Sequence, residues 1–168
     1  MTVRLRPLRL EDEGDARRAH AELDGDRFAF LLDWDPSESW QVYLRKLERY
    51  KRGIDLPARW VRSTFLAAFA GRELVGRVSV RHELNDFLLE LGGHIGYCVR
   101  PQHRRRGYAG EILRQGLVIA RAEGVDRVLV TCDEDNVASA RVIERNGGVL
   151  EDVRANPEGS ARRRYWID

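Results

Sequence analysis

The stretch IGYCVRPQHRRRGYA, residues 95–109, is where the sequence changes from a strand-like pattern to a helical one. Its first residues are mostly apolar, its middle is basic, and Gly107 opens a long amphipathic segment that runs to Glu123. The start of a helix presents unpaired backbone N–H groups and the positive end of the helix dipole, so it binds phosphate readily. Gly107 leaves room where backbone must approach an anion. The sequence therefore predicts a diphosphate cradle at a strand-to-helix junction, with positive charge supplied by Arg104, Arg105 and Arg106.

Apolar periodicity on either side of this junction predicts the remaining elements. The expected helices are Asp12–Leu23, Ser37–Arg52, Gly107–Glu123 and Asn136–Arg145. The expected strands are Thr2–Leu10, Ser63–Ala70, Leu74–His82, His94–Arg100, Asp126–Cys132, Val149–Val153 and Arg164–Ile167. Pro7 places the first strand on a sheet edge, and the passage from His94 to Cys132 predicts a crossover between parallel strands. This order favours a mixed α/β (α+β) sheet with helices on both faces.

Length and composition limit the classes of protein that remain. The chain has 168 residues, 43% of them apolar and 33% charged, which fits a single domain over residues 1–168. It has no apolar stretch near the roughly 18 residues of a membrane span and no signal-peptide core, so we expect a cytoplasmic protein without a membrane partner. Cys98 and Cys132 form no CxxC motif, so we expect two small buried hydrophobic residues and no metal.

The basic junction and the segments after it carry a family resemblance. Arg104, Gly107 and Ala109 match the [Q/R]-x-x-G-x-[G/A] acetyl-CoA signature of the GNAT superfamily of N-acetyltransferases, and VRP at residues 99–101 precedes it. Downstream, Asn136 and Ser139 match N-x-x-[SA], and that segment closes on Asn-Gly at residues 146–147. The chain resembles the superfamily over nearly its whole length, and a bacterial branch described only as predicted acetyltransferases in particular.

The resemblance implies a fold and a cofactor site. The fold would be a mostly antiparallel sheet of about six or seven strands, with one parallel pair that splays to admit acetyl-CoA between residues 95–100 and 128–132. Backbone N–H groups from Arg104 to Ala109 would hold the diphosphate, and the strand edge would bind pantetheine like an added strand. Asn136 would face the pantetheine arm, or cap the last helix, or do both. The implied acetyl-CoA residues are Cys98, Val99, Arg100, Arg104, Arg105, Arg106, Gly107, Tyr108, Ala109, Asn136 and Ser139.

The catalytic residues are less well defined. Acetyl transfer needs a neutral amine and a proton for the leaving CoA thiolate. Many family members supply that proton from a tyrosine seven residues after the asparagine, where this chain has Ile143. We expect Glu83 or His94 as the base and Tyr97 as the acid or an orienting hydroxyl. The alternatives are a solvated Glu83, a His94 with a local hydrogen bond and a Tyr97 in the cleft wall.

For two further segments the sequence allows two structural interpretations each. The run FAFLLDWDP, residues 28–36, fits a buried connection between helices or a lip that faces substrate. The run RRRYW, residues 162–166, fits a rim of the substrate cleft or a charged edge strand.

The leading hypothesis is an acetyl-CoA-dependent N-acetyltransferase acting on a primary amine of a small molecule or protein, with a homodimer left open. The alternative is a non-catalytic acyl-CoA sensor, which the Ile143 departure favours. A nucleic-acid module using residues 100–106 is disfavoured, because the net charge is only +2.

Overall fold

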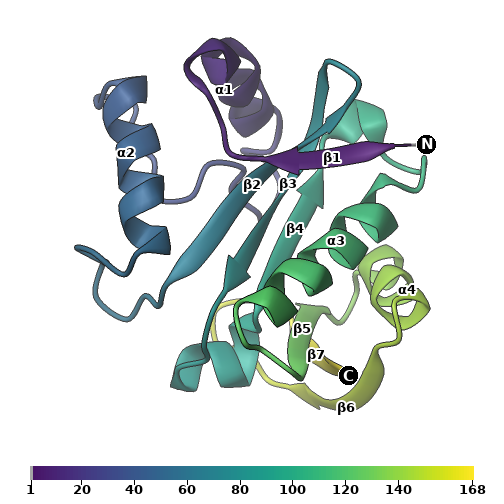
Figure 1. Ribbon diagram of the computed structural model, residues 1–168. Helices are drawn as coiled ribbons and strands as arrows, with labels where there is room; N and C mark the ends of the chain where they lie inside the picture. Colours follow the sequence, from purple (N-terminus) through teal and green to yellow (C-terminus); the bar gives the residue numbers. More distant parts are fainter. Residues whose placement is uncertain (1) are drawn as a thin grey trace.

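The computed structural model describes residues 2–168 and is built on one seven-stranded sheet with the order β1-β2-β3-β4-β5-β7-β6 (Figure 1). The strands are β1 (Val3–Arg6), β2 (Ser63–Ala70), β3 (Glu73–Arg81), β4 (Ile95–Val99), β5 (Val128–Asp133), β6 (Val149–Arg154) and β7 (Arg162–Ile167). Neighbouring strands are antiparallel except for β4 and β5, which are parallel. The prediction of a mostly antiparallel mixed sheet with one parallel pair is confirmed.

The expected helices are all present. They are α1 (Glu13–Glu22), α2 (Trp40–Lys51), α3 (Tyr108–Ala122) and α4 (Val137–Arg145). Each begins one to three residues later than the apolar pattern predicts. For α2 and α4 the reason is capping, because the hydroxyl of Ser39 accepts the Val42 N–H group and the side-chain oxygen of Asn136 accepts the Ser139 N–H group.

The helices lie on both faces of the sheet, as expected. On one face α3 buries Ile112, Leu113 and Leu117 against the central strands. On the other, α2 packs on β2 and α1 on β3, around Tyr43, Phe65 and Phe69. Figure 1 shows α1 and α2 beside β1–β3, at the opposite end of the sheet from β6 and β7. We call the face that carries these two helices the α1/α2 face.

The α1/α2 face differs between the two halves of the sheet. Over β1, β2 and the start of β3 it is apolar and covered, with Ala67, Phe69 and Leu74 among the buried residues. Over β4, β5 and β7 the side chains that alternate onto it are mostly small or polar: Gly96, Cys98, Thr131, Asp133, Arg162 and Arg164, with Leu129 and Trp166 as apolar exceptions. This second half is therefore available for polar chemistry.

Some predicted elements need correction. The first strand ends at Arg6 and not at Leu10, because Pro7 interrupts it and residues 10–12 form a 3₁₀ turn. It does lie on the edge of the sheet. The interpretation of residues 162–166 as an edge strand is wrong, since β7 lies between β5 and β6. A π-helical turn at Leu88–Gly92 was not expected.

The structure also tests the expected burial of the two cysteines and the expected lack of a membrane-spanning helix. Cys132 is buried and burial raises the pKa of its thiol to about 11, whereas Cys98 is partly exposed, so the prediction of two buried cysteines holds for Cys132 only. Within residues 2–168, no helix combines the length and the apolar character that crossing a membrane requires.

Candidate functional site

The turn between β4 and α3 forms an anion cradle from backbone. It passes through a 3₁₀ turn at Pro101–His103 and then takes two left-handed residues, Arg105 with φ 60° and Gly107 with φ 82°. Within the described chain, the N–H groups from Arg105 to Gly110 donate to no acceptor. These N–H groups surround the positive end of a 15-residue helix. Such an array attracts a phosphate group.

The arginines around this turn divide into two kinds. Arg100 is buried and donates to both carboxylate oxygens of Glu22, at 2.9 and 2.6 Å. Arg104 donates to the Val99 carbonyl at 3.1 Å and to Asp26 at 2.6 Å. These two side chains brace the turn. Arg105 and Arg106 are exposed and form no ion pair within residues 2–168, so their charge is available to a ligand.

The remaining cradle residues contribute through their backbone. The Tyr108 side chain is buried and its ring lies 6.3 Å from that of His103, while Ala109 packs against the α3 core. Their N–H groups remain unpaired at the first turn of the helix. The structure thus brings Arg105, Arg106, Gly107, Tyr108 and Ala109 together on one turn with unpaired backbone N–H groups.

The cradle stands at the mouth of a gap between β4 and β5. The two strands pair only at Ile95 and Val130, and they part beyond that point. Gly96, Tyr97 and Cys98 are partly exposed although β4 is the middle strand of the sheet. We call this gap, between residues 96–99 and 131–133, the cleft.

The register decides which backbone groups of β4 face the cleft. The Arg100 N–H group donates to the Val75 carbonyl at 2.8 Å, and Cys98 pairs with Arg77. Alternation in an antiparallel ladder therefore directs the backbone groups of Cys98 and Arg100 toward β3 and those of Tyr97 and Val99 toward the cleft. Of the three residues expected at the pantetheine edge, only Val99 has its backbone on that side. The Tyr97 backbone was missed, because the pattern along β4 alone does not say which neighbour each residue faces.

Two hydroxyl groups meet across the cleft. The Tyr97 hydroxyl, from β4, lies 2.9 Å from the Ser139 hydroxyl, from α4. Burial raises the pKa of Tyr97 to about 12, more than the Ser139 contact lowers it. Tyr97 is therefore protonated near neutral pH and has a proton to donate. Asn136 holds Ser139 in place by capping α4, with its side-chain oxygen 3.1 Å from the Ser139 nitrogen.

His94 has a structural hydrogen bond at its ring. Its Nδ1 accepts the Leu129 N–H group at 2.9 Å, and its own backbone N–H group donates to the Leu129 carbonyl at 2.7 Å. Burial, and then the charge of Arg81, lowers the pKa of His94 to about 4. A neutral imidazole has one acceptor nitrogen and one N–H group. In His94 the acceptor is Nδ1, and it already accepts the Leu129 N–H group. The ring therefore has no lone pair left to receive a substrate proton.

The other two positions tied to acid–base chemistry lie apart from the cleft. Glu83 is exposed on the bend after β3, two residues beyond the Arg81–His94 backbone hydrogen bond. Its carboxylate has no ion-pair partner within residues 2–168. Ile143 is fully buried in the core between α4 and the sheet.

The segment 28–36 combines both of its interpretations. Phe30 and Leu31 are buried in the core beneath α1 and α2, as expected of a buried connection. Phe28 is partly exposed, and its Cζ atom lies 3.6 Å from the position a Cβ would take at Gly96. The first residues of this segment therefore form a wall on the α1/α2 face of the cleft.

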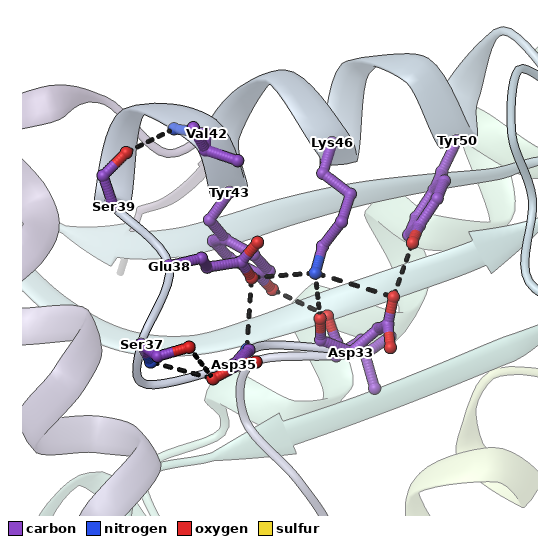
Figure 2. A network of polar contacts seen from close by, with 10 residues as sticks. Asp33, Asp35, Ser37, Glu38, Ser39, Val42, Tyr43, Lys46 and Tyr50 are labelled. Atoms are coloured by element: carbon purple, nitrogen blue, oxygen red, sulfur yellow. Dashed lines mark hydrogen bonds and ion pairs between the residues drawn. The ribbon is translucent and has the colours of Figure 1, made fainter.

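Polar contacts fasten this segment to α2 (Figure 2). The Tyr43 hydroxyl donates to the Leu32 carbonyl at 3.0 Å, and the Tyr50 hydroxyl donates to the Asp33 carboxylate. Lys46 lies between two carboxylates, 2.8 Å from Glu38 and 3.6 Å from Asp33. The wall is thereby held on a rigid helix.

A phosphate cradle at the mouth of a splayed parallel strand pair is the arrangement expected of acyl-CoA-dependent transferases. Residues 2–149 match the family model for the acetyltransferase (GNAT) domain. The chain therefore belongs to the GNAT acetyltransferase family. Its sequence resemblance and its expected class, an acetyl-CoA-dependent acyltransferase, are confirmed at the level of the family.

Relatives agree with this assignment. An uncharacterized N-acetyltransferase of Bacillus subtilis, YjdG, is 31% identical over 74 residues, which cover 44% of this chain and 40% of that relative. RimL, a ribosomal L7/L12 α-N-protein acetyltransferase solved with coenzyme A, is 19% identical, with a TM-score of 0.69 over 100% of this chain and 96% of that one. RimJ of Mycobacterium smegmatis, solved with CoA-disulfide, is 19% identical, with a TM-score of 0.71 over 98% of this chain and 81% of that one.

Proposed function

We propose that the protein, acting as one domain over residues 1–168, transfers the acetyl group of acetyl-CoA to a primary amine. The observation that carries the proposal is the run of unpaired backbone N–H groups from Arg105 to Gly110 at the mouth of the cleft. Arg105 and Arg106 would add charge to the diphosphate site. The backbone of Tyr97 and Val99 would hydrogen-bond the pantetheine arm.

The proposed chemistry forms a bond between the amine nitrogen and the acetyl carbon and breaks the bond from that carbon to sulfur. The amine must lose a proton, and the departing thiolate must gain one. We assign the second proton to the pair Tyr97 and Ser139, and the 2.9 Å contact between their hydroxyls across the cleft supports this assignment. This pair would take the role that Ile143 cannot fill.

The amine proton has a different destination. Because the Leu129 N–H group occupies the lone pair of His94, we propose that water in the cleft takes the amine proton and passes it to Glu83, which lies outside the cleft. Glu83 keeps a carboxylate free of ion pairs in the described chain. RimL is described as a ribosomal L7/L12 α-N-protein acetyltransferase, which adds the α-amine of a protein to small amines as an acceptor class to test.

The alternative is a non-catalytic sensor that binds acetyl-CoA and releases no thiol. Acetyl-CoA should be incubated with the protein and a panel of polyamines, aminoglycosides, amino acids and peptides, and free thiol measured. Amine-dependent thiol release that is lost in Gly107→Glu would support the transferase. Binding of acetyl-CoA without release for any member of the panel would favour the sensor.

We further propose a cytoplasmic homodimer. Both cysteines are free, as suits a reducing compartment. The edge strand β6 exposes Val149, Leu150 and Val153, and an exposed apolar edge strand offers a surface for strand pairing. Sedimentation of the wild type and of Leu150→Lys would test this, with a monomeric wild type as the contradicting result.

A further inference from the structure

Three arginines converge on the α1/α2 face beside the cleft. Arg77 and Arg81 come from β3 and Arg162 from β7. All three donate to main-chain carbonyls of one short segment: Arg162 Nε to Leu91 at 3.2 Å, Arg81 Nη1 to Gly92 at 3.2 Å and Gly93 at 3.3 Å, and Arg77 Nη1 to Gly96 at 3.3 Å. We call these side chains the arginine cluster.

Elsewhere in the protein, well-buried arginines have carboxylate partners. Arg6 pairs with Asp12 at 2.7 Å, Arg100 with Glu22 at 2.6 Å, and Arg164 with Asp152 at 2.8 Å. Within residues 2–168, neither Arg77 nor Arg81 has a carboxylate within 4.0 Å, the limit for these ion pairs. A cation withdrawn from water without an anion is unfavourable. The cluster therefore carries an excess of positive charge that the described chain does not offset.

Arg77 and Arg81, the two arginines without a carboxylate partner, differ in how many of their N–H donors remain available. Arg77 is fully buried, and its three nitrogens donate to the carbonyls of Phe30, Ala29 and Gly96. Arg81 donates from Nη1 only, and its Nε and Nη2 have no partner in the described chain. These atoms are not among the enclosed unpaired nitrogens, and the side chain is partly exposed. Arg81 can therefore present a two-donor fork to a ligand.

Arg81 also lies close to the expected site of reaction. Both of its terminal nitrogens are 3.5 Å from the position of a Cβ at Gly96, a position that the Phe28 ring also approaches. Gly96 is next to Tyr97, whose hydroxyl points to the other face of the sheet toward Ser139. An acceptor that enters over the α1/α2 face would thus meet Arg81 beside Gly96, one residue along the chain from Tyr97, with the Tyr97 hydroxyl on the opposite face of the sheet.

The charge state of Arg81 suits an anionic ligand. Burial, and then the charges of Arg77 and Arg162, lowers the pKa of Arg81 to about 10. The guanidinium is still cationic at neutral pH. Asp133 faces Arg162, at 2.6 Å, and it is the carboxylate that offsets part of the cluster's charge.

We propose that Arg81, assisted by Arg162, binds a carboxylate of the acceptor, so that the acceptor is an amine that also carries a carboxylate group. The inference rests on the proposed function, because it names the acceptor class of the same site. Two sources share this chemistry: the α-carboxylate of a free amino acid and the acidic side chain of the first residue of a peptide.

Matched acceptor pairs test the proposal and separate the sources. Alanine would be compared with alaninamide, and the peptide Asp-Ala-amide with Asn-Ala-amide, by kcat/KM for thiol release. In at least one of the two pairs, kcat/KM of the wild type should be about 10- to 100-fold higher for the acceptor with the carboxylate, which is the effect of a charge-assisted hydrogen bond. Arg81→Gln should reduce that preference below about threefold, mainly through KM. The control Arg114→Gln, on exposed α3 surface beside Glu111, should leave the preference unchanged.

A binding measurement keeps the result independent of turnover. Calorimetry would compare N-acetylalanine with N-acetylalaninamide, and the two acetylated peptides with each other, on the protein saturated with CoA. Carboxylate-selective binding that Arg81→Gln abolishes would support the inference even if no amine released thiol and the proposed function failed. Thiol release at equal rates within both pairs would leave the proposed function standing and overturn the inference.

Thermal melting of each variant controls for misfolding. Should Arg81→Gln fail to fold, Arg81→Lys takes its place, because it keeps the charge and loses the fork. A carboxylate preference reduced at least threefold in Arg81→Lys would support the proposal, and an unchanged preference would contradict it.

Discussion

The α1/α2 face of the sheet has two halves that differ in their side chains and in what covers them. Over β1–β3, residues such as Phe69 and Leu74 are closed under α1 and α2. Over β4, β5 and β7 the same face carries Gly96, Thr131 and Arg162, and the two central strands separate. The first half supplies stability, and the second half lines the cleft. Substitutions in the two halves should therefore affect different measurements.

The largest expected effect is on the cradle beside the open half. Gly107→Glu should abolish acetyl-CoA binding, because it adds a carboxylate and a Cβ where the diphosphate would lie. Gly107 has φ 82°, so any other residue strains the turn. Gly107→Ala carries that strain without the charge and should keep measurable affinity in calorimetry. Equal binding by Gly107→Glu and the wild type would place the diphosphate site elsewhere.

The covered half should respond in stability alone. Leu74 is 1% exposed, and Leu74→Ala should destabilise the protein by about 2–5 kcal/mol in urea unfolding. Cys98→Ala, on the neighbouring open half, should cost less than about 1 kcal/mol, because the side chain is smaller and partly exposed. If Cys98→Ala were the more destabilising change, the division of the face into two halves would be wrong.

The open half should respond in turnover. Tyr97→Phe should lower kcat by roughly 10- to 1,000-fold and leave acetyl-CoA affinity nearly unchanged. Ser139→Ala removes the partner hydroxyl, and it should lower kcat less if Tyr97 is the donor. A fall of less than twofold in Tyr97→Phe would return that residue to the cleft wall.

The remaining expected effect concerns His94 and pH. The pKa of His94 is about 4 in the folded protein and about 6.5 when unfolded. The unfolded state therefore binds more protons between these values, so His94 contributes stability above pH 6.5 that is lost as the pH falls toward 4. Urea unfolding from pH 7 to 4.5 should show a shallower loss in His94→Gln than in the wild type.

The same variant tests the assignment of the base. The rising limb of kcat/KM with pH should survive in His94→Gln, because Leu129 occupies the ring nitrogen. If Glu83 is the base, Glu83→Gln should remove that limb. Loss of the limb in His94→Gln alone would reverse the assignment.

Sequence alone could predict the features that depend on local pattern. Apolar spacing placed α3 within one residue at each end, and Ser63–Ala70 matches β2. The cradle followed from a basic turn before that helix. Local patterns could not predict which strands pair with each other. The interior position of β7 and the orientation of the Tyr97 backbone toward the cleft both depend on that pairing. The missing carboxylate at Arg81 is likewise a property of the assembled sheet.

The central claim is that the turn before α3 binds the diphosphate of acetyl-CoA, and thermal unfolding with two matched ligands tests it most directly. Acetyl-CoA at about 100 times its Kd should stabilise the protein by about 2.7 kcal/mol, which raises Tm by roughly 5–10 °C. Acetylpantetheine, which carries the same thioester without the diphosphate, should raise Tm by less than about 1 °C at the same concentration. Equal shifts with the two ligands, or none with acetyl-CoA on the folded protein, would contradict the claim.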